Sequence, residues 1–150
     1  MNQIITLPVS KLILNENTPE RKLRVEHYLI PYYQRGYRWE IENVKALLDD
    51  IHNFIDSKEE FYCLQPIVVV PNLDKDGLRI WEVIDGQQRL TTLYIIFKFL
   101  GISRYNILFG ERTLSNDFLE NLNHETYNHS NPDFHFMSEA YKCVKEWFEN

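Results

Sequence analysis

The segment Asp85–Thr91, Asp-Gly-Gln-Gln-Arg-Leu-Thr, contains residue types that together can bind a phosphate group. It follows the β-branched pair Val83-Ile84 and precedes a long apolar run, so we expect it where a strand passes into a helix. The first backbone N–H groups of a helix have no partner inside it and carry the positive end of its dipole, which favours an anion. Gly86 lets a ligand approach the backbone closely, and Arg89 adds a cation with a planar fork of donors. The pattern therefore suits a phosphate site.

A capping box is the alternative interpretation of the same segment. Asp85 is followed three residues later by Gln88, and two such side chains can close the start of a helix without any ligand. The local sequence is compatible with both interpretations.

An aromatic and basic segment, Ile30–Trp39, lies further upstream. Its sequence Ile-Pro-Tyr-Tyr-Gln-Arg-Gly-Tyr-Arg-Trp interleaves aromatic rings with two arginines. Aromatic faces can stack on a base while guanidinium groups bind phosphates. The alternative is a structural anchor, in which the rings lie in a core and the arginines are solvated. That alternative is the stronger one for Trp39.

The two segments together resemble a known family. Pro-Tyr-Tyr-Gln-Arg-x-Tyr-x-Trp is followed about fifty residues later by Asp-Gly-Gln-Gln-Arg-Leu-Thr-Thr-Leu. From about Leu7 to Leu122 the chain resembles the N-terminal domain of GmrSD-type, modification-dependent restriction proteins, which is grouped with the ParB and sulfiredoxin-like superfamily. The resemblance implies an α+β fold with a small mixed sheet, packed helices and a helical C-terminal portion.

The resemblance also implies binding and hydrolysis of a nucleoside triphosphate, coupled in some members to recognition of modified DNA. By position, Asp85 would hold Mg²⁺ or a water, Gln88 would orient the attacking water, and Arg89 would neutralise charge on the transferred phosphoryl group. Further phosphate contacts are implied for Gln34, Arg35, Arg38, Gly86, Gln87, Thr91 and Thr92, and base stacking for Tyr33 and Tyr37. A carboxylate at a helix start repels phosphate unless a metal or proton intervenes, so the role of Asp85 depends on Mg²⁺. The chain has no Walker P-loop, so nucleotide binding would use a different architecture.

We therefore expect a nucleotide-binding, nucleotide-hydrolysing regulatory domain of a DNA restriction or phage-defence protein. Two alternatives are a ParB-like DNA-binding module without hydrolysis and an interaction scaffold without activity. Members of the family often carry an HNH-type nuclease domain, which we expect in cis or on a partner subunit, because these residues include none of it. The last predicted helix ends without a Gly or Pro signal, so we expect the natural protein to continue beyond Asn150.

The composition of the chain limits which classes of protein these expectations can include. The 150 residues are 44% hydrophobic and 14% aromatic, which is enough for one core. No apolar run reaches the roughly 18 residues of a membrane span, and no leader pattern opens the chain, so we expect a cytoplasmic protein. A net charge of −6 argues against bulk electrostatic binding of nucleic acid. The basic residues that gather before the first acidic helix are compatible with a local cationic pocket; they are Arg21, Lys22, Arg24, Arg35 and Arg38.

Cysteine and histidine usage indicates no metal site. Cys63 and Cys143 belong to no C-x-x-C pair, so we expect two unpaired thiols. The spacings of His124, His129 and His135 match no established ligand pattern.

Periodicity and turn signals predict the elements that must position the site. We expect helices at 9–14, 40–57, 87–100, 115–122 (capped by Ser115) and 134–149, strands at 23–29, 66–70, 78–84 and 105–109, and polar loops at 15–21 and 126–132. The strands at 66–70 and 78–84 flank Asp76-Gly77 and should form a hairpin. The helix at 87–100 is apolar on almost every side and should be buried. We expect a nucleotide-binding domain over 1–122 and the truncated start of a helical extension over 123–150.

Overall fold

The computed structural model describes residues 6, 8, 9, 12, 27–77, 79–103, 105–126 and 130–150. Within these ranges the elements follow in the order β1 (His27–Ile30), α1 (Ile41–Ile55), β2 (Val68–Leu73), β3 (Arg79–Asp85), α2 (Gln87–Phe99), β4 (Ile107–Phe109), α3 (Thr113–Glu120) and α4 (Pro132–Glu149). The expected α+β fold, with a small mixed sheet and a helical C-terminal portion, is confirmed.

The sheet has the strand order β2-β3-β1-β4. β1 runs parallel to both β3 and β4, whereas β2 and β3 form the predicted antiparallel hairpin. Because β1, β3 and β4 are parallel, their carboxyl ends, Ile30, Asp85 and Phe109, lie at the same edge of the sheet. In open sheets of this kind, ligands bind outside the carboxyl ends of the strands. Both sequence motifs begin at this edge.

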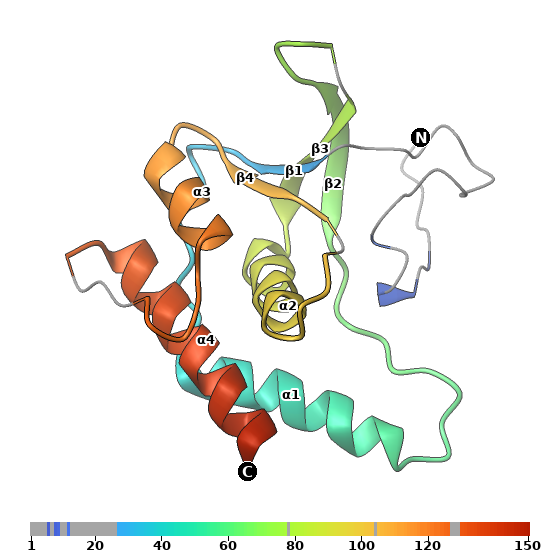
Figure 1. Cartoon of the computed structure of the whole chain (residues 1–150). Helices are drawn as coiled ribbons and strands as arrows, with labels where there is room; N and C mark the ends of the chain where they lie inside the picture. Colours follow the sequence, from blue (N-terminus) through green and yellow to red (C-terminus); the bar gives the residue numbers. More distant parts are fainter. Residues whose placement is uncertain are drawn as a thin grey trace.

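Helix α2 forms the centre of the molecule. Figure 1 shows the sheet above α2, α1 below it and α4 at its lower left. Leu90 and Ile95 of α2 are completely buried, and α4 contributes Met137 and Val144 to the same core. The predicted burial of the helix at 87–100 is therefore confirmed. The division of the chain after residue 122 stays a prediction from the sequence.

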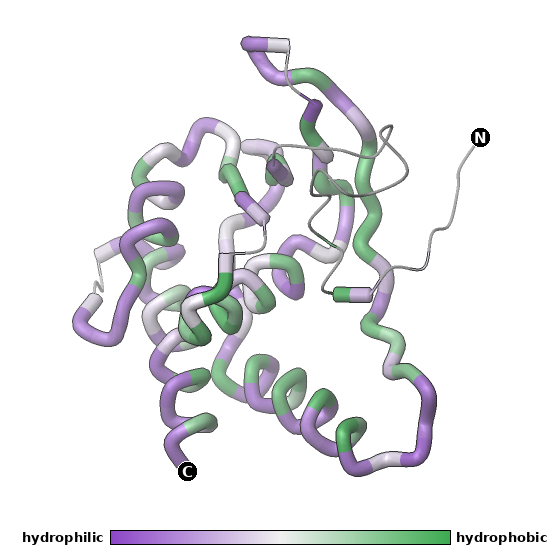
Figure 2. The backbone as a smooth tube through the Cα atoms, turned by 45° about the vertical axis from the view of Figure 1, so that its right-hand side comes forward, coloured by the Kyte–Doolittle hydropathy of each residue, from purple (hydrophilic) through white to green (hydrophobic). Residues whose placement is uncertain are grey.

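Helix α1 is amphipathic, as its spacing of apolar residues predicts. Val44, Leu47 and Leu48 are buried, and Figure 2 shows hydrophobic residues on the side of α1 that faces the other helices. A capping box closes its start, in which Glu40 and Asn43 bond to each other's backbone N–H groups. This helix holds the end of the aromatic and basic segment in place, because Trp39 comes directly before its cap.

The structure corrects two details of the predicted elements. Helix α3 begins at Thr113 with Arg112 at its N-cap, so Ser115 is not the cap. The hydroxyl of Ser115 instead donates to Oδ2 of Asp133 at 3.1 Å. The strand expected at 105–109 begins only at Ile107, and Tyr105 before it is buried and donates from its hydroxyl to the carbonyl oxygen of Leu90.

Several predictions concern residues outside the described ranges. These are most of the helix at 9–14, the loop at 15–21, most of the strand at 23–29, and the side chains of Arg21, Lys22, Arg24 and His129. None of the helices in the described part of the chain has the length and apolar content that a membrane crossing requires. Cys63 is exposed and Cys143 is buried, and both are unpaired thiols as expected.

Buried tyrosines make the fold less stable at alkaline pH. Burial raises the pKa of Tyr28 to about 12, and it also raises the pKa values of Tyr37 and Tyr105. A tyrosine in the unfolded chain loses its proton near pH 10, so above that pH the folded state holds more protons than the unfolded state. The free energy of unfolding therefore keeps its full value below about pH 10. Above that pH it falls by about 1.4 kcal/mol per pH unit for each such tyrosine. Urea unfolding followed by circular dichroism at about pH 8 and about pH 11 measures this; an equal free energy of unfolding at both values would contradict it.

Candidate functional site

The two sequence motifs meet at the carboxyl edge of the sheet. Gln88, in the first turn of α2, donates from Nε2 to the carbonyl oxygen of Gly36 at 2.9 Å. Its Oε1 accepts the backbone N–H of Arg38 at 2.7 Å. One turn further along α2, Oγ1 of Thr92 lies 2.8 Å from the hydroxyl of Tyr37. The loop between β1 and α1 is thus bonded directly to the first two turns of α2.

The same loop also holds the end of β3. Nε2 of Gln34 donates to the carbonyl oxygens of Val83 at 2.7 Å and Ile84 at 3.1 Å. The hydroxyl of Tyr33 donates to Oε1 of Glu82 at 3.0 Å, and this hydrogen bond raises the pKa of Tyr33 above its ordinary value. The ring of Tyr33 is 63% exposed. It therefore presents an aromatic face to solvent beside β3.

The start of α2 has no side-chain cap. Gly86 is the N-cap residue, and no side chain caps it among the described residues. Oδ1 of Asp85 accepts the N–H of Gly86 at 2.8 Å, whereas the amide of Gln88 faces the loop at 36–38. The capping-box interpretation of these residues is therefore wrong. The first N–H groups of α2 keep the positive partial charge that attracts an anion.

The fold itself explains why residue 86 is glycine. Gly86 has φ of 87°, a left-handed conformation that side chains disfavour. A Cβ built there would lie 3.1 Å from Cα of Ile67 and 3.2 Å from the carbonyl oxygen of Pro66. The segment before β2 thus fills the side of Gly86 on which the sequence suggested a ligand. A ligand of α2 must approach the helix from another direction.

The arginines predicted to bind phosphate differ in their surroundings. Arg89 donates from Nη1 to the carbonyl oxygens of Gln65 at 3.1 Å and Pro66 at 3.4 Å, and from Nη2 to Oε1 of Gln65 at 2.7 Å. A guanidinium group has five N–H donors, so these bonds fix its position and leave donors available. Arg35 is exposed and makes no hydrogen bond or ion pair with any residue that the structure describes.

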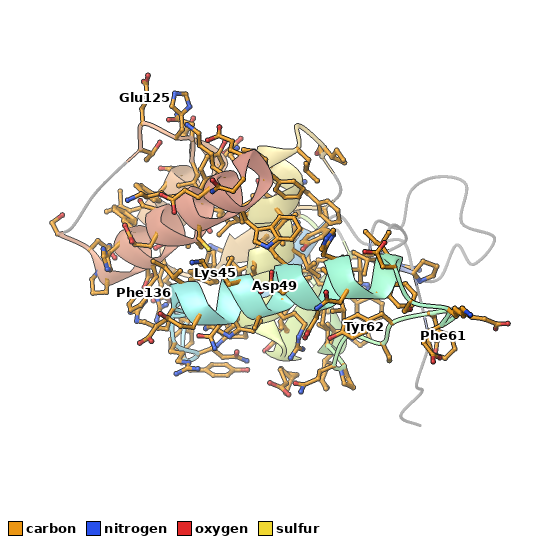
Figure 3. All side chains as sticks on the ribbon, turned by 90° about the horizontal axis from the view of Figure 1, so that it is seen from below. Lys45, Asp49, Phe61, Tyr62, Glu125 and Phe136 are labelled. Carbon is orange, nitrogen blue, oxygen red and sulfur yellow. The ribbon has the colours of Figure 1, made fainter. Side chains whose placement is uncertain are left out.

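Arg38 is turned toward α4. Its Nη1 donates to the carbonyl oxygen of Tyr37 at 2.6 Å and pairs with Oδ1 of Asp133. The guanidinium carbon lies 5.6 Å from the centre of the Phe136 ring, and in Figure 3 Phe136 lies beside the N-terminal end of α1. The side chain of Arg38 is therefore held by Asp133, and its phosphate contact stays a prediction from the sequence.

The comparison with protein families agrees with the motifs now seen together. The family model described as the N-terminal domain of GmrSD restriction endonucleases matches residues 10–150. The chain belongs to this GmrSD family. It is therefore a domain of a restriction or phage-defence protein. No curated protein sequence matches the chain.

Several residues that the sequence assigned to ligand binding are buried in this GmrSD domain. Tyr37 and Thr91 are each 1% exposed, and Thr92 is completely buried. Oγ1 of Thr91 and Oγ1 of Thr92 donate to carbonyl oxygens of the preceding helical turn, at 2.8 Å and 2.9 Å. Tyr37 therefore has no face on which a base could stack, and the two threonines point into the core. Gln88 is also buried, and both ends of its amide are bonded to the loop, so it is not placed to orient a water.

Within the described residues, a magnesium ion at the start of α2 would need oxygen ligands besides those of the protein. Among the described residues, no three His, Cys, Asp or Glu side chains gather into a metal site. The exposed Asp85 offers Oδ2, since Oδ1 is bonded to Gly86. Mg²⁺ is commonly bound by one or two carboxylates together with phosphate oxygens and waters. Asp85 fits that pattern if a phosphate lies beside it.

A cavity of about 250 Å³ lies elsewhere in the molecule. Residues from the C-terminal half of α2 and the segment after it line this cavity, namely Tyr94, Phe97, Lys98, Gly101, Ile102, Ser103 and Tyr105. None of these residues belongs to either motif, so the cavity is separate from the candidate site.

Sequence reasoning missed Asp133 and Arg112. Both lie at the carboxyl edge and contact the aromatic and basic segment. In the sequence, Asn131-Pro132-Asp133 matches an ordinary helix start, in which an acidic residue complements the helix dipole. No local signal distinguishes such a residue from one that pairs with distant arginines.

Proposed function

We propose that this domain binds a nucleoside triphosphate with Mg²⁺ at the start of α2 and hydrolyses it. The observation that supports this most directly is the uncapped first turn of α2 at the carboxyl edge of the sheet, with Arg89 in that turn and Arg35 in the loop that bonds to it. A helix start with a nearby cation is a site for phosphate. Asp85 beside the same turn can supply a carboxylate for Mg²⁺.

Each proposed contact uses a group that the fold leaves available. The backbone N–H groups of the first turn, from Gln87 onward, would contact phosphate oxygens. Arg35 supplies a cation that pairs with none of the described residues, and the remaining donors of Arg89 supply a second one held in a fixed position. Tyr33 offers a face for stacking on the base. Hydrolysis of a phosphoanhydride depends mainly on such positioning and charge neutralisation, so few residues can suffice.

The remaining motif residues would act on the site indirectly. Gln88 binds the loop backbone at Gly36 and Arg38, and Gln34 binds the end of β3. These bonds fix the distance between the loop that carries Arg35 and the helix that carries Arg89. The motif residues would thus hold the site in its binding geometry as well as contact the ligand.

In the full-length protein, we propose that the nucleotide regulates cleavage of modified DNA in the cytoplasm. The nuclease would be an HNH-type domain, in cis or on a partner subunit. The family description, restriction endonuclease, supports a nuclease partner and DNA as its substrate.

A ParB-like DNA-binding module is the second candidate. Tyr32 and Tyr33 are 66% and 63% exposed, and the two rings lie edge to face close to Arg35 in the chain. Exposed aromatic rings next to a cation can bind a nucleic-acid strand as well as a mononucleotide. The third possibility is an interaction scaffold that binds neither.

A thermal-shift experiment separates these candidates. We expect one of ATP, GTP, CTP and UTP, with Mg²⁺, to stabilise the wild type by about 2.7 kcal/mol at about 100 times its dissociation constant. Arg89→Ala should abolish most of this shift. Lys142→Ala is the matched control, because it removes one positive charge from an exposed position on α4; it should keep the shift. Stabilisation by duplex DNA and by no triphosphate would favour the DNA-binding module, and no stabilisation by either ligand would favour the scaffold.

A further inference from the structure

A buried carboxylate joins three parts of the chain behind the candidate site. Asp133, at the start of α4, is 5% exposed. Its Oδ1 pairs with Arg38, while its Oδ2 lies 3.5 Å from Nη1 of Arg112 and accepts the hydroxyl of Ser115 at 3.1 Å. A buried charge persists only when it is paired and hydrogen-bonded, so these contacts form one unit.

This unit holds both ends of the loop that carries Arg35. At one end, Nη2 of Arg112 donates to the carbonyl oxygen of Gln34 at 2.9 Å, and Gln34 in turn bonds to the end of β3. At the other end, Arg38 is paired with Asp133 by its side chain and with Gln88 of α2 by its backbone N–H. Hence a continuous series of contacts runs from the start of α4 to the first turn of α2.

The backbone between these ends packs directly on the carboxylate. Gly36 is buried, and a Cβ built on it would lie 2.5 Å from Nη1 of Arg112 and closer still to Oδ1 of Asp133. A side chain at residue 36 would therefore have to displace the carboxylate of Asp133 or the guanidinium group of Arg112. The backbone of the loop and the carboxylate are thus in direct contact.

We propose that Asp133 is a positioning residue for the candidate site. It holds the loop at 34–38, which carries Arg35, against the start of α2. This proposal rests on the proposed nucleotide site for its functional consequence, but the positioning itself does not depend on any ligand. The start of α4 is therefore part of the site, although it contacts no ligand.

Amide hydrogen exchange of the ligand-free protein tests the positioning. In Asp133→Asn, exchange of the peptide that covers 34–39 should become at least about tenfold faster, because the loop loses both arginine anchors. Exchange in the middle of α1 should not change. The control Val144→Ala truncates a completely buried residue on the same helix without touching the unit around Asp133; it should leave the exchange of 34–39 as in the wild type. Unchanged loop exchange in a folded Asp133→Asn protein would overturn the proposal.

A second variant and a second measurement make every outcome decisive. If Asp133→Asn does not fold, Arg112→Met takes its place, since the side chain of Arg112 is 34% exposed and its loss is easier to tolerate. It should accelerate the exchange of 34–36, and unchanged exchange there contradicts the proposal. The dissociation constant of the triphosphate that stabilises the wild type should then rise about tenfold in Asp133→Asn and less than about twofold in Val144→Ala. If the wild type binds no triphosphate, the proposed function fails, while the exchange result still decides the role of Asp133.

Discussion

We expect Gly36→Ala to lower the free energy of unfolding by about 3 kcal/mol, a large effect for a single methyl group. The added Cβ would occupy space that belongs to Oδ1 of Asp133 and Nη1 of Arg112. Moving either atom breaks the ion pairs that neutralise a buried carboxylate, and moving the loop instead breaks its bonds to Gln88. Neither adjustment is cheap, because both the carboxylate and the amide of Gln88 are buried.

Gly77→Ala is the matched control for this substitution. It adds the same methyl group, but nothing lies within 4 Å of a Cβ built on Gly77, and the only difficulty is a φ of 77°. Its cost should be about 1 kcal/mol. Urea unfolding of the two variants and the wild type measures the difference. Equal stability of Gly36→Ala and the wild type would show that the loop does not pack on Asp133 as described.

The second large effect concerns two neighbouring arginines, which we expect to differ in their contributions to ligand affinity and to stability. Arg35→Ala should weaken binding of the nucleoside triphosphate by about 10- to 100-fold and leave stability unchanged, because Arg35 is exposed and bonded to no described residue. Arg38→Ala should lower the free energy of unfolding by about 2 kcal/mol, because it removes one of the two cations that neutralise Asp133. The direct effect of Arg38 on phosphate binding should be small.

Calorimetric titration of the triphosphate and urea unfolding of both variants give the affinity and the stability of each. The titrations are made at a temperature at which both variants are folded. An Arg38→Ala protein with wild-type stability and lost affinity would reverse the assignment. It would place the guanidinium of Arg38, and not that of Arg35, on the ligand.

The elements that are marked by strong local signals could be predicted from the sequence. Helix α2 is the clearest case, because its apolar residues and Gly86 together define its start and its burial. The hairpin of β2 and β3 follows from β-branched runs on either side of Asp76-Gly77. These features depend on residues close together in the chain, so local patterns are sufficient.

The surroundings of each site residue could not be predicted in this way. Arg35 and Arg38 are equivalent in the sequence, and only the position of Asp133, far along the chain, makes one of them a structural residue. Tyr33 and Tyr37 differ for a similar reason, since only Tyr37 meets a helix that buries it. The alternative of a structural anchor was therefore correct for the ring of Tyr37, whereas Arg38 is ion-paired and not simply solvated. Only tertiary contacts distinguish the two residues of each pair.

Site mapping by nuclear magnetic resonance tests the central claim most directly. A ¹⁵N-labelled sample is titrated with the four nucleoside triphosphates in the presence of Mg²⁺, and the amide shifts are followed residue by residue. We predict that one triphosphate moves the amides of Gly86, Gln87 and Arg89 most, together with those of Tyr33 and Arg35. Shifts that gather instead around the cavity lined by Tyr94 and Tyr105, or the absence of shifts at millimolar concentrations of every triphosphate, would contradict a nucleotide site at the start of α2.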